Sequence, residues 1–209
     1  MSSGGRSVRS RRRRKVADGG RNVFITVGTT KFEKLIREID SLECVKMFVS
    51  MGVTSIVCQI GHGSHVPFCG HGFGNGAAAE CGTTQQDDYK KYLLKSVIGA
   101  GISIETFRHK PSIAQYIGEA DVIIGHAGVG TIMETVRAEK PLLVIVNTDL
   151  MDNHQTEVAE EMSKMGHIHM GYPRTLKTIL ATENIFKVTP YPRKDLGAFP
   201  KLLDDLMGF

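Results

Sequence analysis

The segment from Asp121 to Glu134 contains the residues best suited to chemistry in this chain, because a short apolar run leads directly into glycines. Its sequence is Asp-Val-Ile-Ile-Gly-His-Ala-Gly-Val-Gly-Thr-Ile-Met-Glu. A helix opened by Thr131 would present free N–H groups and the positive end of its dipole to an anion. His126 stands at the same turn and can donate a hydrogen bond to a phosphate oxygen. The segment therefore predicts a binding site for a diphosphate. Its glycines lack a Cβ and so let the backbone turn tightly and approach the ligand; they are Gly125, Gly128 and Gly130.

Two further polar segments follow apolar runs. Gly28-Thr29-Thr30 follows a run at residues 22–27, and the polar stretch 147–155 follows a run at residues 142–146. Ligands of open α/β sheets bind beyond the carboxyl ends of the strands, where the order of the strands reverses. The first turn lacks G-x-G-x-x-G and the chain has no P-loop, which argues against NAD and ATP. The alternative for Gly28 to Thr30 is an ordinary strand-to-helix turn with a threonine as the N-cap.

Strands and helices alternate along the chain. Apolar runs predict strands at 22–27, 55–60, 102–107, 122–124 and 142–146. Helices are predicted near 32–39, from Pro111, at 131–139 and from about Asn153 to Met165, with Gly166 as the C-cap. Weaker helical patterns lie at 89–96, 175–180 and 199–207. This alternation predicts an α/β fold with a doubly wound, parallel, Rossmann-like sheet.

Residues 61–88 break this pattern and predict a long Gly-rich insertion loop. Zinc binding is the alternative interpretation of this region, but the spacings of the possible ligands fit no common pair of ligand motifs. These possible ligands are Cys58, His62, His65, Cys69, His71 and Cys81. We expect an insertion loop and no metal site.

Composition divides the chain into a tail and a domain. The 209 residues are 41% hydrophobic and 23% charged, as expected for one globular domain with tails. Residues 1–15 contain seven of the 26 basic residues and no acid, so the rest of the chain has a net charge of −3. We predict a disordered basic tail over residues 1–21, which is either dispensable or binds nucleic acid or anionic lipid. No apolar run approaches a membrane span or a signal peptide, and the cysteine pattern favours a reduced, cytosolic protein.

Three motifs in this order resemble one known family: Phe24-Ile-Thr-Val-Gly-Thr-Thr30, Ile124-Gly-His-Ala-Gly-Val-Gly-Thr131 and Leu150-Met-Asp-Asn-His-Gln155. The family is the smaller, donor-binding subunit of the eukaryotic heterodimeric UDP-N-acetylglucosamine transferase of dolichol-linked oligosaccharide synthesis. It is similar in turn to the C-terminal half of GT-B glycosyltransferases. The resemblance covers residues 22–207, so it implies that residues 22–209 form a UDP-sugar-binding domain equivalent to that half.

The resemblance implies a role for each motif residue. His126 would stabilise the charge on the departing UDP, and Glu134 would hold the ribose hydroxyls. Alternatively, His126 is a structural histidine, and Glu134 simply interacts with the helix dipole. The loop at 107–110 would lie against the uracil. The diphosphate would contact Gly28, Thr29, Thr30, Gly128, Val129, Gly130 and Thr131. The sugar would contact Asp152, Asn153, His154 and Gln155. Asp152 can also cap a helix.

The resemblance also implies a reaction and partners. GlcNAc would pass from UDP-GlcNAc to dolichol-diphosphate-GlcNAc with inversion, without a metal or other cofactor. Separately, no basic stripe lies outside the tail, so we expect no nucleic-acid partner for the domain. The chain has one domain's worth of sheet, so a membrane-anchored, acceptor-binding subunit would supply the acceptor half and the general base. The resemblance places this assembly at the cytosolic face of the endoplasmic reticulum. Two alternatives remain, a non-catalytic nucleotide-sugar-binding regulatory subunit and a UDP-sugar epimerase.

Overall fold

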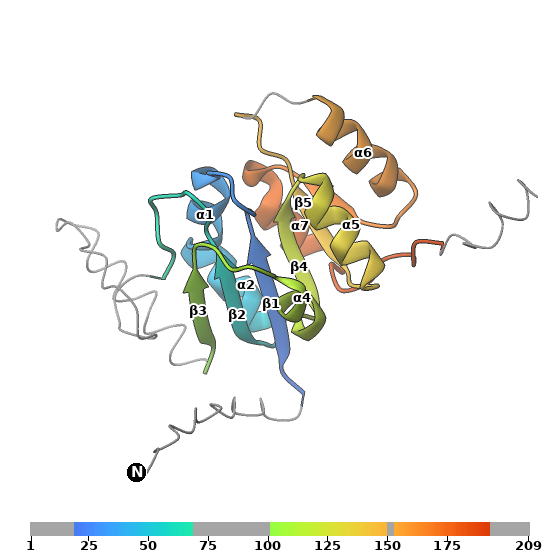
Figure 1. Cartoon of the computed structure of the whole chain (residues 1–209). Helices are drawn as coiled ribbons and strands as arrows, with labels where there is room; N and C mark the ends of the chain where they lie inside the picture. Colours follow the sequence, from blue (N-terminus) through green and yellow to red (C-terminus); the bar gives the residue numbers. More distant parts are fainter. Residues whose placement is uncertain (1–18, 69–100, 150–152, 193–209) are drawn as a thin grey trace, which may run out of the picture.

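Six parallel strands form the centre of the molecule in a computed structural model that describes residues 19–68, 101–149 and 153–192 (Figure 1). Their order in the sheet is β3-β2-β1-β4-β5-β6, and every neighbouring pair is parallel. This confirms the predicted doubly wound sheet. The strands are β1 (Arg21–Thr26), β2 (Val53–Gln59), β3 (Ser103–Phe107), β4 (Val122–His126), β5 (Leu142–Ile145) and β6 (His169–Gly171).

The strand order reverses between β1 and β4. The chain runs outward from β1 through β2 to β3, returns to place β4 beside β1, and then runs outward on the other side to β6. The connections after β1 and β4 consequently leave the sheet in opposite directions. A crevice at the carboxyl ends of these two strands is where doubly wound sheets bind ligands, and both glycine-containing turns of the sequence lie there.

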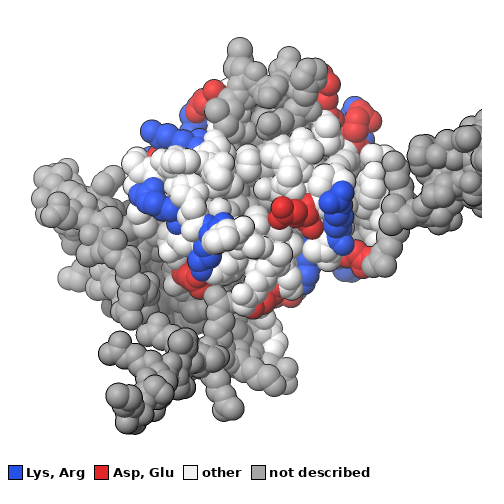
Figure 2. Space-filling model, in the orientation of Figure 1, with Lys and Arg blue, Asp and Glu red and all other residues white. Residues whose placement is uncertain are grey.

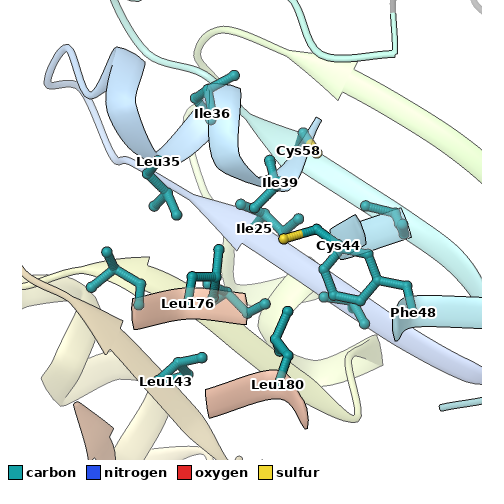
Figure 3. Packing of buried hydrophobic residues seen from close by; sticks show 14 of the residues in the cluster. Ile25, Leu35, Ile36, Ile39, Cys44, Phe48, Cys58, Leu143, Leu176 and Leu180 are labelled. Carbon is teal, nitrogen blue, oxygen red and sulfur yellow. The ribbon is translucent and has the colours of Figure 1, made fainter. Parts of the chain in front are cut away.

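Helices cover both faces of the sheet, which is why the central strands are apolar on both sides. One face packs against α1 (Glu33–Ile39), α2 (Leu42–Ser50) and α7 (Leu176–Thr182), which follows a short 3₁₀ turn at Pro173–Thr175. The other face packs against α4 (Ala114–Glu119), α5 (Val129–Arg137) and α6 (Asn153–Lys164). Figure 3 shows the first of these layers, where Leu35, Phe48 and Leu176 meet Ile25 of β1.

Two elements were absent from the sequence prediction. Helix α2 follows α1 after only two residues, and the sequence pattern of a single amphipathic helix does not separate them. It buries Cys44, Val45 and Phe48 on one side. Strand β6 has three residues and pairs only with β5, so it is too short to produce an alternating pattern.

The boundaries around the central motif differ from those predicted. Strand β4 continues to His126, and α5 begins at Val129 instead of Thr131. The reason is that Gly128 has an extended conformation and serves as the N-cap, so its carbonyl accepts the N–H of Ile132 at 3.0 Å. Helix α4 likewise begins at Ala114 and not at Pro111. The prediction for Gly166 is confirmed: it follows the end of α6 with φ of +76°.

The first part of the Gly-rich segment, residues 61–68, is packed against α1. A carboxylate oxygen of Glu33 accepts the N–H of Ser64 at 2.5 Å, and Asp40 accepts the N–H of Phe68 at 2.9 Å. Burial raises the pKa of Glu33, but the hydrogen bonds from Ser64 and His65 outweigh it and the net shift is downward. Residues 69–88, the basic tail up to residue 18 and the predicted helices at 89–96 and 199–207 lie outside the described residues.

Neither a metal cluster nor a membrane span is found in the described part of the chain. Within residues 19–68, 101–149 and 153–192, no three histidine, cysteine or acidic side chains are grouped so as to hold a metal ion. Cys58, one of the possible zinc ligands, is fully buried in the core beside α1, and burial raises its pKa. Among the same residues, no helix combines the length and the apolar character that crossing a membrane requires.

Candidate functional site

The turn after β1 is a tight β-turn at the carboxyl edge of the sheet. Its closing hydrogen bond runs from the N–H of Thr30 to the carbonyl of Val27 at 3.2 Å. Gly28 has φ of +61°, whereas Thr29 does not have a positive φ. A positive φ at the first central position alone defines a type II′ turn, which favours glycine there. The sequence motif therefore needs Gly28 for its backbone conformation.

The imidazole of His126 lies between the two glycine turns. A Cβ added to Gly28 would lie 2.9 Å from Cε1 of His126, and one added to Gly128 would overlap Nε2. Both turns therefore lack a side chain at the point where the ring is packed. The ring is therefore close to both Gly28 and Gly128.

The two ring nitrogens of His126 have different surroundings. Nδ1 is buried and has no hydrogen-bond partner among the described residues, whereas Nε2 is the nitrogen on the side of Gly128 and the start of α5. Burial lowers the pKa of His126, and the nearby backbone of Thr26 opposes this shift only in part. The ring is therefore neutral near pH 7 and can donate a hydrogen bond only from the nitrogen that carries its proton.

The start of α5 presents the free N–H groups that the sequence predicted. The first helical bond is that of Ile132 to Gly128, so the N–H groups of residues 129–131 have no acceptor within the helix, and no side chain caps it. A Cβ on Gly130 would meet nothing within 4 Å. The side chain of Thr131, in contrast, is buried with its methyl group facing Gly125 of β4. Thr131 can thus offer its N–H to a ligand at this site, but its side chain packs against the sheet.

Glu134 lies on the exposed side of α5, beyond the first turn of the helix. It lines a shallow groove between α4 and α5 together with Ser112, Ile117 and Arg137. Figure 2 shows that most of the described surface on this side of the molecule is neither acidic nor basic, with charged side chains in small separate groups. The groove is lined from the middle and the end of α5 and not by residues 128–131, so the contact of Glu134 with a ribose stays a prediction.

The loop after β3, predicted to lie beside the uracil, is tied to its own surroundings. The Nζ atom of Lys110 lies 4.4 Å from the ring centroid of Phe107 and 4.5 Å from that of Tyr116. Arg108 donates hydrogen bonds to the carbonyls of Gly61 and Gly63 at 3.3 and 2.5 Å. The ring of Phe107 is packed against Tyr116 with the centroids 5.0 Å apart. Side-chain contacts thus hold the loop in place, and its contact with the uracil stays a prediction.

The end of β5 contacts the segment that follows the first turn. Asn147 is buried and donates a hydrogen bond to the carbonyl of Lys31 at 3.4 Å, and Lys34 pairs with Asp149 at 2.6 Å. The third motif begins just beyond. Helix α6 starts at Asn153, but the side chains of residues 150–155 lie outside the described part of the structure, so the roles of Asp152, Asn153, His154 and Gln155 remain predictions.

The sequence analysis did not assign Thr26 or Gln59 to the site, and it considered His62 only as a possible zinc ligand. Thr26 and Gln59 form a buried hydrogen bond of 2.7 Å beneath the first turn. His62 contacts the carbonyls of Thr29 and Thr30 from the other side. One signal was available, because Gln59 is a polar residue inside the apolar run 56–60, and a buried amide needs a partner.

The region that contains both glycine turns and His126 is similar to known proteins. Residues 22–190 match the glycosyltransferase family 28 C-terminal domain. This chain belongs to that family. The matched region begins at the second residue of β1 and includes every later described strand and helix, so both glycine turns and His126 lie inside it.

Relatives of this family 28 chain include proteins named UDP-N-acetylglucosamine transferase subunit ALG13. The mouse protein is 32% identical over 148 residues, which are 71% of this chain but only 10% of the mouse protein. The Saccharomyces cerevisiae protein is 28% identical over 194 residues, which are 87% of this chain and 93% of the yeast protein. The chain therefore spans about a tenth of the length of its mouse relative and most of the length of its yeast relative.

Solved structures show the same fold. An NMR solution structure of ALG13 superposes with a TM-score of 0.55 at 20% identity, covering 88% of this chain and 95% of that one. A crystal structure of MurG from Acinetobacter baumannii gives a TM-score of 0.53 at 18% identity. The match covers 92% of this chain but 44% of the MurG chain, so the family 28 chain corresponds in fold to one part of a longer protein.

Proposed function

We propose that this chain is the donor-binding subunit of an inverting glycosyltransferase that moves GlcNAc from UDP-GlcNAc to dolichol-diphosphate-GlcNAc. The observation that carries the proposal is the contact of the His126 ring with both glycine turns at the strand-order reversal. Membership of family 28 and the similarity to proteins named as UDP-N-acetylglucosamine transferase subunits support the choice of donor.

In the proposed complex the diphosphate of the donor lies over the mouth of α5. The free N–H groups of residues 129–131 and the positive end of the helix dipole bind it, and Nε2 of His126 donates to it when the proton is on that nitrogen. Glu134, on the exposed side of α5, accepts the ribose hydroxyls. The sugar then extends toward residues 152–155 at the start of α6.

In the reaction, a hydroxyl oxygen of the acceptor sugar attacks the anomeric carbon of GlcNAc. The new carbon–oxygen bond forms as the bond to the diphosphate oxygen breaks, and UDP departs with the electron pair. The α5 N–H groups and His126 stabilise the negative charge that develops on the departing diphosphate. The proton of the acceptor hydroxyl passes to a general base, which we place in a membrane-anchored partner that also binds the acceptor at the cytosolic face of the endoplasmic reticulum.

Calorimetric titration of the full chain with UDP-GlcNAc, UDP-glucose and UDP tests the donor site. We expect Glu134→Gln to weaken UDP binding about tenfold, because a neutral amide is a poorer acceptor for ribose hydroxyls than a carboxylate. Glu160→Gln removes an exposed carboxylate from α6 and is the matched control, with unchanged binding. Absence of UDP binding by the unaltered chain would refute the proposal.

Transfer assays separate the alternatives. In a complex with the partner, His126→Ala is expected to abolish most of the transfer, whereas a non-catalytic regulatory subunit would tolerate the change. A UDP-sugar epimerase would convert UDP-GlcNAc without the partner, so analysis of the sugar after incubation with the isolated chain distinguishes this activity as well.

A further inference from the structure

A buried polar pair lies directly beneath the type II′ turn. Thr26 ends β1 and Gln59 ends β2, and the two residues are partners in the strand register, so their side chains leave the sheet on the same side. Thr26 is 0% exposed and Gln59 is 4% exposed. The hydroxyl of Thr26 donates to Oε1 of Gln59 at 2.7 Å and accepts the N–H of Gly28 at 3.0 Å. Burying a hydroxyl and an amide in an apolar sheet costs free energy that these hydrogen bonds must offset.

This pair decides which N–H groups of the turn remain free. The N–H of Gly28 is bonded to Thr26, and the N–H of Thr30 is bonded to the carbonyl of Val27. In the part of the chain that the structure describes, the N–H of Thr29 donates to no acceptor. The turn can therefore offer one backbone donor to a ligand, from Thr29.

The loop after β2 sets the direction of that donor. A Cβ on Gly61 would lie 2.8 Å from the carbonyl oxygen of Gly28, so this carbonyl faces the loop. The N–H of His62 donates to the carbonyl of Thr30 at 3.3 Å, and its Nδ1 contacts the carbonyl of Thr29. In a trans peptide the N–H points opposite to the preceding carbonyl. With the Gly28 carbonyl facing the loop, the Thr29 N–H faces away from it.

We propose that Thr26 and Gln59 are positioning residues for the donor diphosphate: their hydrogen bond holds the turn so that the Thr29 N–H faces the phosphate. The inference rests on the proposed function, because it gives a ligand to that N–H. A donor held in place before the ligand arrives needs no reorganisation when it binds. The pair itself touches no substrate.

The test compares Thr26→Val with Thr26→Ser in the full chain. Valine keeps the branched shape but leaves the Gly28 N–H and Oε1 of Gln59 without partners, whereas serine keeps the hydroxyl. In NMR titrations we expect Thr26→Val to bind UDP about tenfold more weakly and Thr26→Ser to stay within about threefold of the unaltered chain. Uridine, which lacks phosphates, should bind all three proteins equally. The Gly28 amide should exchange with solvent faster in Thr26→Val only.

Each other outcome overturns a specific step. If the two variants bind UDP equally well, the positioning role is wrong while the donor site stands. If Thr26→Val loses UDP and uridine to the same extent, the pair only supports the fold. If the unaltered chain binds no UDP, the proposed function fails and the inference fails with it. Gln59→Met, which keeps the size and removes the acceptor, serves as the second variant should Thr26→Val not fold, with the same expected selective loss of UDP.

Discussion

The two glycine turns, at the carboxyl ends of β1 and β4, differ in the hydrogen bonding of their backbone N–H groups. In the turn after β1, hydrogen bonds within the protein occupy the N–H groups of Gly28 and Thr30, and the carbonyls face the loop after β2. In the turn after β4, three consecutive N–H groups at the N-terminus of α5, those of residues 129–131, have no acceptor among the residues that the structure describes. Among the described residues, the first turn therefore leaves one N–H group free, that of Thr29, and the second leaves three. Similar residues at two neighbouring strand ends therefore differ, because the first turn closes on itself before α1 begins at Glu33, whereas Gly128 is itself the N-cap of α5.

The largest expected effect comes from Gly128→Ala. The added Cβ would overlap Nε2 of His126 and displace the ring from between the turns. We expect a loss of roughly 100-fold in transfer by the complex, comparable to the effect of misplacing a catalytic group by about 1 Å. The measurement is the initial rate of GlcNAc transfer, with circular dichroism as the check on folding. Transfer at the unaltered rate would show that the position of His126 does not matter.

Gly130→Ala sharpens the comparison, because a Cβ there meets no protein atom. We expect the free energy of unfolding to rise by about 0.5–1 kcal/mol, since alanine favours the helix, while UDP binding weakens about tenfold because the methyl group enters the space before the free N–H groups. Gly118→Ala in α4 also meets no atom within 4 Å and is the matched control. It should raise stability without changing UDP binding. If both variants change the affinity for UDP equally, the ligand does not bind at the N-terminus of α5.

The smallest expected effect is on the pH dependence of stability. Burial lowers the pKa of His126, so the unfolded chain takes up a proton at this residue before the folded chain does as the pH falls through about 6.5. The free energy of unfolding therefore decreases as the pH falls through this range. We expect His126→Asn to lose less stability between pH 7.5 and 5.5 than the unaltered chain in urea titrations. The other histidines are common to both proteins and cancel in the comparison. Equal losses would mean that the ring is exposed to solvent.

Apolar runs predicted the five longer strands correctly to within two residues at each end, because strands buried on both faces are apolar along their length. They could not predict β6, where two half-buried residues and the buried Gly171 depend on β5 for pairing. The end of β4 was also misplaced. His126 continues the strand because it pairs in register with Ile145, a contact between segments that are distant in sequence.

The sequence by itself determined that glycine turns follow β1 and β4 and that a helix begins after the second turn. The backbone freedom of glycine and the free N–H groups at the start of a helix are local properties of the chain. Tertiary structure alone decided that β1 and β4 are neighbours, that the imidazole of His126 fills the gap between their turns, and that Thr26 and Gln59 meet beneath one of them. Those contacts depend on strand order and register, which arise from packing between segments far apart in the sequence and leave no local pattern in it.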